Sequence, residues 1–151
     1  MQDRSFTFIT RLAPVPFGEL RPKVEAALKA EGFGVLTEID VQATLKAKLD
    51  VDRPPFLILG ACNPSLSHRM LDVEPAIGAL LPCNVVLRED GDAVVVEMMD
   101  PRMMVGMIDN AVVREIAEDA RGRLRKAMAA IEREFAAAPT GQDAAASTAQ
   151  R

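Results

Sequence analysis

The sequence predicts an α+β domain: a two-layer sandwich in which helices cover one face of a largely antiparallel sheet. Short apolar runs of strand length alternate with amphipathic helical segments along the chain. Two of these runs flank Asp90-Gly91, a strong signal for a tight hairpin, so at least part of the sheet is antiparallel. The first and last helices of the series each have one apolar stripe, so both are expected to cover the same face of the sheet.

The first part of the chain contains two strands and two helices. The run at 5–12 is rich in Phe, Ile and Thr and stops before a proline, which is typical of a strand. Apolar residues then recur at helical spacing over 16–31, and Gly32 suits the left-handed residue that ends a helix. A second strand at 33–39 follows, and Asp40 is a suitable cap for a short helix that runs through Leu49.

The central part of the chain contains three strands. The segment at 56–62, FLILGAC, is apolar on both faces, which predicts a central strand. A helix begins at Asn63-Pro64, because asparagine caps a helix and proline suits its first turn. A second short apolar segment stands between two prolines, and strands at 83–89 and 92–99 form the predicted hairpin.

The last part of the chain predicts one long helix. Asp100-Pro101 repeats the cap-plus-proline pattern, and apolar residues then recur at helical spacing from Val113 to Phe135. We therefore expect a single domain over 1–136. The Ala-rich segment 137–151 has no large apolar residue and is expected to be a flexible tail.

The composition excludes several classes of function. The chain of 151 residues has 18 basic and 22 acidic side chains, a net charge of −4, which argues against nucleic-acid binding. No stretch approaches the roughly 18 apolar residues of a membrane helix, and the N-terminus does not have the pattern of a secretory signal. We therefore expect a cytoplasmic protein without membrane partners, whose thiols stay reduced.

The few reactive side chains of the chain are expected to meet. There is one His, there are two Cys, and there is no Trp or Tyr, which excludes a disulfide scaffold and a conventional zinc finger. If the strands at 56–62 and 83–89 are antiparallel neighbours, Cys62 and Cys83 lie at the same end of the sheet. His68 lies on the segment between them, so the three side chains can converge.

Three further polar side chains accompany this cluster. Each cysteine is followed by an asparagine, Asn63 and Asn84, whose amide can cap a helix or hold a ligand. Glu74 lies on the same connecting segment and could add a carboxylate.

The cluster admits several interpretations. The cysteines could be packing residues, since free cysteine behaves as a small apolar side chain. Cys62, His68 and Cys83 could instead hold zinc or copper, although their spacing matches no strong zinc signature. A thiol nucleophile or redox pair is another possibility, with His68 as the base, and a small-ligand pocket is the last.

Two other groups of residues admit both a functional and a structural interpretation. Five of the eight methionines fall within 98–107; thioethers favour Cu(I), but filling an irregular corner of the core is the simpler interpretation. Glu38 and Asp40 are alternate residues at a strand end and could project together. Asp40 is more simply a helix cap, and Glu38 a solvated surface residue.

The sequence resembles the family called domain of unknown function 302 over about residues 5–135. The segments GACNP and LPCNV occur in the family's order, with the single histidine between them, and VVVEMMDP precedes the last helix. The resemblance implies a TATA-binding-protein-like α+β fold with a curved antiparallel sheet, in a bacterial cytosolic protein that forms homodimers. The family's motif positions correspond to Glu38, Asp40, Cys62, Asn63, Pro64, His68, Glu74, Pro82, Cys83 and Asn84.

The sequence therefore supports three hypotheses for function. The first is a binding domain that holds a small molecule or a soft metal ion at the Cys/His cluster. The second is a thiol-dependent enzyme or redox protein. The third is a structural or dimerisation module in which the cysteines only pack.

Overall fold

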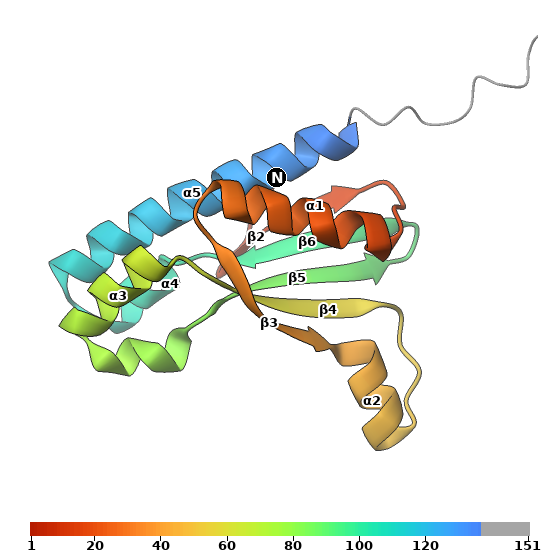
Figure 1. Ribbon diagram of the computed structural model, residues 1–151, viewed down its shortest axis with the longest axis horizontal. Coiled ribbons are helices and arrows are strands. Elements are labelled where there is room, and N and C mark those ends of the chain that lie inside the picture. Colours follow the sequence, from red (N-terminus) through yellow and green to blue (C-terminus); the bar gives the residue numbers. More distant parts are fainter. Residues whose placement is uncertain (137–151) are drawn as a thin grey trace, which may run out of the picture.

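The computed structural model describes residues 1–136 as a six-stranded sheet with helices packed on one face (Figure 1). The Ala-rich tail expected at 137–151 lies outside the described residues. The strand order is β1-β2-β6-β5-β4-β3, and every strand pair described is antiparallel. The strands are β1 (Gln2–Asp3), β2 (Thr7–Leu12), β3 (Gly34–Asp40), β4 (Phe56–Cys62), β5 (Cys83–Asp90) and β6 (Ala93–Met99). The predicted α+β class with an antiparallel sheet is confirmed.

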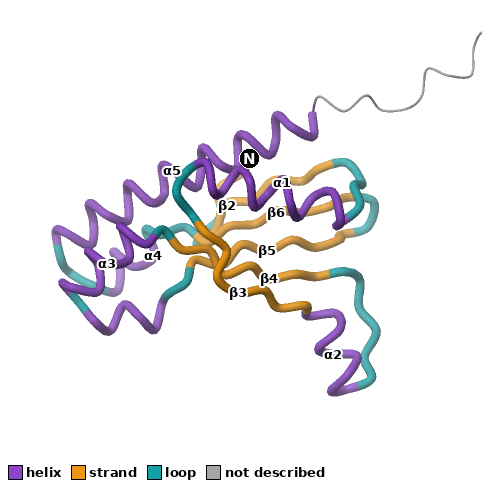
Figure 2. The backbone as a smooth tube through the Cα atoms, in the orientation of Figure 1, coloured by secondary structure: helices purple, strands orange, loops and turns teal. Residues whose placement is uncertain are grey.

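The helices form the second layer and close the two ends of the sheet. The first and last long helices, α1 and α5, lie side by side across one face, as expected (Figure 2). None of the helices within residues 1–136 is both long and apolar enough to cross a membrane. The helices are α1 (Phe17–Ala30), α2 (Val41–Leu49), α3 (Pro64–Val73), the 3-10 helix η1 (Pro75–Leu80), α4 (Met103–Met107) and α5 (Ala111–Ala136).

The core lies between the sheet and these two helices. Alternate residues of β6 point into it, and Val94, Val96 and Met98 are at most 3% exposed. Leu87 is paired with Val96 across the β5–β6 ladder and is fully buried as well. Val95, which lies between Val94 and Val96, is fully buried too, so β6 is apolar on both faces.

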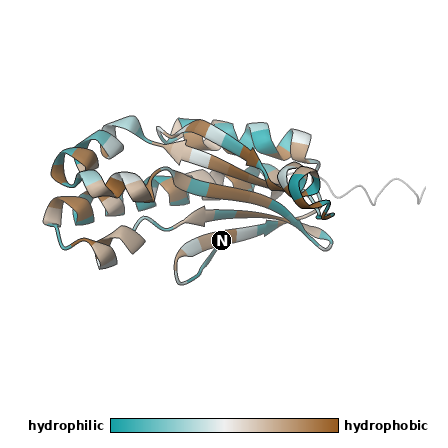
Figure 3. Cartoon of the chain, turned by 90° about the horizontal axis from the view of Figure 1, so that it is seen from below, coloured by the Kyte–Doolittle hydropathy of each residue, from teal (hydrophilic) through white to brown (hydrophobic). Residues whose placement is uncertain are grey.

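The connecting helices gather at opposite ends of the sheet. In Figure 1, α3 and α4 lie beyond one end of the strands and α2 beyond the other, and Figure 3 shows the same elongated arrangement from below. β4 ends and β5 begins at the end occupied by α3. The ends of these two strands therefore lie beneath a helical cap.

The long helix predicted from Val113 to Phe135 is present, but a separate short helix that was not predicted precedes it. The segment after β6 forms the short α4, and the long α5 begins only at Ala111. Asn110 explains the separate start, because its side-chain oxygen accepts hydrogen bonds from the backbone N–H groups of Val112 at 2.8 Å and Val113 at 3.3 Å. Asp100 accepts a bond from the backbone N–H of Arg102 at 3.0 Å in the turn before α4.

Two smaller features also differ from expectation. The two-residue strand β1 was not expected, because Gln2–Asp3 contains no apolar side chain. The predicted hairpin between β5 and β6 is present, but Asp90 is still paired with Ala93, so Gly91 and the residue after it make the turn. Gly91 has a φ of 66°, which glycine adopts without strain.

Candidate functional site

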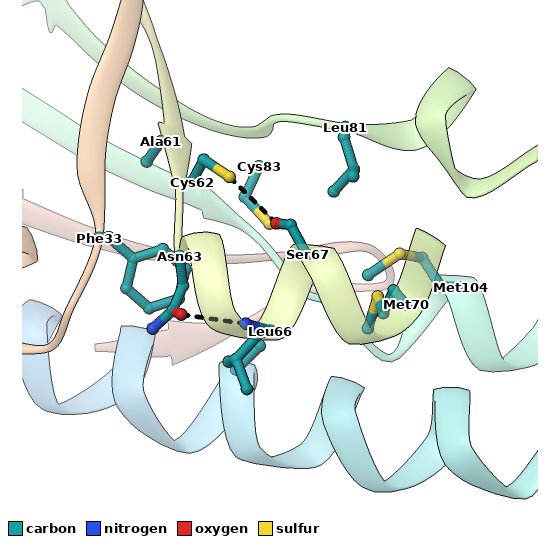
Figure 4. A pocket seen from close by; sticks show the side chains of 11 residues that line it. Phe33, Ala61, Cys62, Asn63, Leu66, Ser67, Met70, Leu81, Cys83 and Met104 are labelled. Atoms are coloured by element: carbon teal, nitrogen blue, oxygen red, sulfur yellow. Dashed lines mark hydrogen bonds between the residues drawn. The ribbon is translucent and has the colours of Figure 1, made fainter. Parts of the chain in front are cut away.

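A small cavity lies where β4 and β5 meet the helical cap (Figure 4). Its volume is about 20 Å³. No charged side chain lines it, and two cysteines and two methionines do. The lining residues are Phe33, Ala61, Cys62, Asn63, Leu66, Ser67, Met70, Leu81, Cys83, Met104 and Ala120.

The sheet register brings the two cysteines to this cavity. β4 ends at Cys62 and β5 begins at Cys83, and the cross-strand partner of Cys83 is Ala61. The two cysteines are therefore one position out of register on neighbouring antiparallel strands. Cys62 is half-buried and Cys83 is 7% exposed, and neither forms a disulfide.

Helix α3 closes the cavity and supplies a hydroxyl group to it. The Sγ of Cys62 lies 3.0 Å from the Oγ of Ser67, within hydrogen-bond distance. Asn63 caps α3, since its side-chain oxygen accepts a bond from the backbone N–H of Leu66 at 3.2 Å. Asn63 is 7% exposed, so the cap is part of the cavity wall and fixes where α3 starts.

The apolar environment of Cys83 favours the neutral form of its thiol. Burial, with a smaller contribution from the nearby Cys62, raises the pKa of the Cys83 thiol from 9.0 to about 11. Cys83 is therefore protonated at neutral pH in the metal-free protein. A thiol in this state is a poor nucleophile, since the thiolate is the reactive form.

The structure does not bring His68 to the cysteines. Its side chain is 77% exposed, and its Nε2 lies 3.6 Å from Oδ2 of Asp72, one helical turn further along α3. Leu66 and Met70 are at most 7% exposed and fix which face of α3 turns inward. His68 lies between them in sequence and therefore points away from the cavity.

The carboxylates expected near the site have other roles. Glu74 accepts a bond from the backbone N–H of Ala76 at 2.9 Å and so caps the 3-10 helix. Glu38 accepts a bond from Nε of Arg21 at 2.6 Å, on the surface between β3 and α1. Neither carboxylate lines the cavity.

Two further positions that were weighed also lie outside the cavity. Asp40 accepts a bond from the backbone N–H of Ala43 at 2.8 Å and caps α2, which is the simpler of its two expected roles. Asn84 is exposed on β5, one position after the buried Cys83, because successive strand residues point to opposite faces. Of the expected site residues, the cavity therefore contains Cys62, Asn63 and Cys83.

Sequence reasoning did not single out Ser67 or Met70, and it named Met104 only within a Met-rich group that was interpreted more simply as filling the core. Ser67 and Met70 are three residues apart on α3, so they lie on one helical face with the buried Leu66. That spacing could have placed both side chains on the buried face of α3. Met104 belongs to the Met-rich segment, and its position depends on the separate α4, which the apolar pattern did not reveal.

The acidic, histidine and cysteine side chains do not form a larger cluster in residues 1–136. Over this part of the chain, no three of them lie close enough together to hold one metal ion. A closed zinc site needs four such ligands. The cavity instead combines two thiols with two thioethers.

Comparison with known proteins identifies the family of the chain. The family model described as "Domain of unknown function DUF302" matches residues 9–131. A crystal structure of an uncharacterized conserved DUF302 protein from Bacillus stearothermophilus is 31% identical and superposes with a TM-score of 0.77; the match covers 85% of this chain and 99% of that one. No curated protein matches the sequence. The chain therefore belongs to the family called domain of unknown function 302.

Proposed function

We propose that the chain binds one thiophilic metal ion between the thiols of Cys62 and Cys83. The observation that carries the proposal is that both thiols line a single cavity of about 20 Å³. A cavity must offer roughly 10–15 Å³ to hold one water molecule, so this one has room for one small ion. Thiolates are ligands that soft metals prefer.

The size of the cavity favours an ion over an organic ligand. Pockets for drug-sized molecules have volumes of roughly 300 Å³ or more. The lining of the present cavity is uncharged, and Asn63 uses its side-chain oxygen to cap α3. An organic molecule would require α3 to move away from the ends of β4 and β5.

The geometry supports a thiol-dependent enzyme less well than it supports a metal-binding protein. A catalytic thiol needs a base within hydrogen-bond reach. The neighbour of Cys62 is the Ser67 hydroxyl, and His68 is paired with Asp72 on the exposed face of α3. A metal ion needs no such base, because its binding displaces the thiol protons directly. We propose a cytoplasmic location, where both thiols stay reduced and available.

The proposal is tested by metal protection of the thiols. The full chain is reduced, desalted without oxygen and titrated with Hg(II), which binds two thiolates in a linear arrangement. One equivalent per chain is expected to protect both cysteines from alkylation, as measured by mass spectrometry. In Cys62→Ala and Cys83→Ala the remaining thiol is expected to bind the ion more weakly and to lose protection when a small dithiol competes.

His68→Ala is the matched control for this experiment. His68 is exposed and lies outside the cavity, so this variant is expected to bind Hg(II) as the wild type does. Two results would overturn the proposal. One is a wild type that needs one metal equivalent per thiol; the other is a loss of binding in His68→Ala equal to that in the cysteine variants.

We also propose that the chain forms a homodimer through the edge strand β3. Leu36 and Ile39 on β3 are 66% and 49% exposed, and one long edge of this strand has no partner among the described residues. An exposed edge with apolar side chains is suited to pairing with another strand. Two copies of β3 could pair antiparallel around a two-fold axis, which is the commonest oligomer symmetry.

Sedimentation of the purified protein tests the dimer. Leu36→Lys is expected to shift the protein from dimer to monomer, because it places a charge in the paired edge. Met107→Lys is the control, since Met107 is 61% exposed on the distant α4. A wild type that sediments as a monomer at all concentrations, or an unchanged dimer in Leu36→Lys, would contradict the proposal.

A further inference from the structure

We infer that the ion bound in the cavity is monovalent copper and that Met70 and Met104 contribute thioether ligands to it. This inference rests on the proposed function, because it specifies the metal at the same cysteine pair. Its support is the arrangement of four sulfur-bearing side chains around one small cavity (Figure 4).

The two methionines reach the cavity from different helices. Met70 lies on α3, one turn after Ser67, and is 3% exposed. Met104 lies on α4 and is 2% exposed. In Figure 4 their sulfur atoms lie near each other toward one end of the cavity, and the thiol sulfurs of Cys62 and Cys83 lie toward the other end, beside Ser67.

The flexibility of methionine allows the thioethers at one end of the cavity and the thiols at the other end to bind the same ion. The side chain has three rotatable bonds, so its sulfur can move toward an ion without a shift of the backbone. The rest of the wall is mostly apolar, with Phe33, Leu66 and Leu81 on different sides (Figure 4), and its oxygen-bearing side chains, Asn63 and Ser67, are engaged in hydrogen bonds. The sulfur atoms are therefore the donors that such a movement would offer to an ion.

The donor set distinguishes Cu(I) from Zn(II). Thiolates and thioethers are soft ligands that favour Cu(I), whereas zinc sites are completed by thiolate, imidazole or carboxylate groups. Beyond the cysteine pair, the cavity wall contains no imidazole or carboxylate, and none of its side chains is charged.

The binding step is a ligand exchange without electron transfer. Copper enters as Cu(I) bound to a low-molecular-mass thiol, and it remains Cu(I). The bond between copper and the donor's thiolate sulfur breaks, and bonds to the Sγ atoms of Cys62 and Cys83 form. One cysteine proton passes to the departing thiolate and the other passes to the solvent, and the neutral thioethers of Met70 and Met104 complete the coordination without further proton release.

Affinity measurements on methionine variants test the inference. Cu(I) is delivered without oxygen, in competition with a chromophoric Cu(I) chelator, to the wild type and to the double variant Met70→Leu/Met104→Leu. We expect the double variant to bind Cu(I) about 10- to 100-fold more weakly, the scale at which groups around a metal alter its affinity. Its capture of one Hg(II) by the two thiols is expected to be unchanged.

Met98→Leu is the matched control. Met98 is fully buried on β6 but does not line the cavity, so this variant has the same chemical change without the loss of a ligand. Its affinity for Cu(I) is expected to equal that of the wild type. An equal loss in the control and in the double variant would show that the methionines only pack, and would overturn the inference.

X-ray absorption of the copper-loaded wild type provides a second measurement that needs no variant. We expect three or four sulfur neighbours around copper, whereas two sulfur neighbours would overturn the inference and leave the cysteine site intact. Failure of the proposed function has a different signature, since neither Hg(II) nor Cu(I) would then bind the cysteine pair as one equivalent. The two proposals can therefore fail separately.

Discussion

Cys62 and Cys83 lie one position out of register at the ends of neighbouring antiparallel strands, because Cys83 is paired with Ala61. This register places both thiols under the first turn of α3, where Ser67 contacts Cys62. The chain contains no other cysteine. A metal site built from two thiols therefore depends on the positions where β4 ends and β5 begins.

Gly60→Ala, on β4 two residues before Cys62, is expected to lower the free energy of unfolding. A Cβ atom at residue 60 would lie 2.2 Å from the Oγ1 of Thr37 and 2.7 Å from the Cγ of Pro82. Overpacking of this kind costs about 1–3 kcal/mol in the free energy of unfolding, which denaturant titration measures. Gly34→Ala is the control, because nothing lies within 4 Å of its added Cβ. Equal stability of the two variants would contradict the packing around Gly60.

Asn63→Ala is expected to weaken the start of α3. Asn63 caps the helix through the N–H of Leu66, and loss of such a cap costs about 0.5–2 kcal/mol. Chemical denaturation of the metal-free protein measures the loss. Asn84→Ala, at the exposed position after Cys83, removes the same amide and is expected to leave the free energy of unfolding unchanged. A larger effect at Asn84 would refute these assignments.

The pH dependence of stability is expected to report the burial of Cys83. The folded chain holds the thiol proton more tightly than the unfolded chain, since burial raises the pKa from 9.0 to about 11. The stability that this thiol contributes is fully present below pH 9.0 and is lost as the pH rises toward 11. In metal-free Cys83→Ala, the fall in the free energy of unfolding over this range should be shallower. A slope identical to that of the wild type would argue against a buried neutral thiol.

Asp100→Asn is expected to destabilise the turn before α4. The carboxylate is 4% exposed and accepts bonds from Arg102 at 2.8 Å and Arg121 at 3.0 Å. Burial alone would raise the pKa of Asp100, but the bonds from Arg102 and Arg121 outweigh it and lower the pKa below 3.8. Removal of one partner from such a buried pair costs on the order of 1–3 kcal/mol.

The sign of this pH effect follows from the lowered pKa. The stability from Asp100 is present above the unfolded value of 3.8 and is lost as the pH falls through the lower folded value. Asp100→Asn should therefore lose less stability than the wild type on acidification. Asp109→Asn is the control, since Asp109 is 98% exposed in its pair with Arg114. An acid response in Asp100→Asn as steep as that of the wild type would contradict the assignment.

Much of the fold could be predicted because its main determinants are local. The apolar run of β6 appears directly in the sequence and predicts a strand, but it does not show which face meets the helices, because Val94, Val95 and Val96 are all apolar and buried. The strand β1 could not be predicted in this way. It is held by contacts that are distant in sequence, such as the pairing of Asp3 with Arg125.

Only the part of the candidate site that lies at the ends of strands could be predicted from the sequence. Cys62 and Cys83 end and begin two adjacent strands, so their meeting followed from the order of the elements. The place of His68 depends on how α3 is rotated about its axis. The buried pair Leu66 and Met70 sets that rotation and turns His68 outward.

The contribution of Met104 could not be predicted from local pattern. Its buried position depends on the separate helix α4, whereas the apolar periodicity that predicted one long helix begins only at Val113, after the cap at Asn110. The position of Met70 could have been predicted, since Met70 follows Leu66 by four residues on α3 and so lies on the same helical face.

The central claim is that a metal ion binds between Cys62 and Cys83. Anomalous diffraction from crystals of the protein loaded with one equivalent of Cu(I) without oxygen tests it most directly. The account predicts one copper peak in the cavity, within bonding distance of both Sγ atoms. A peak beside His68 and Asp72 with none between the cysteines, or copper spread over exposed methionines such as Met107, would contradict it.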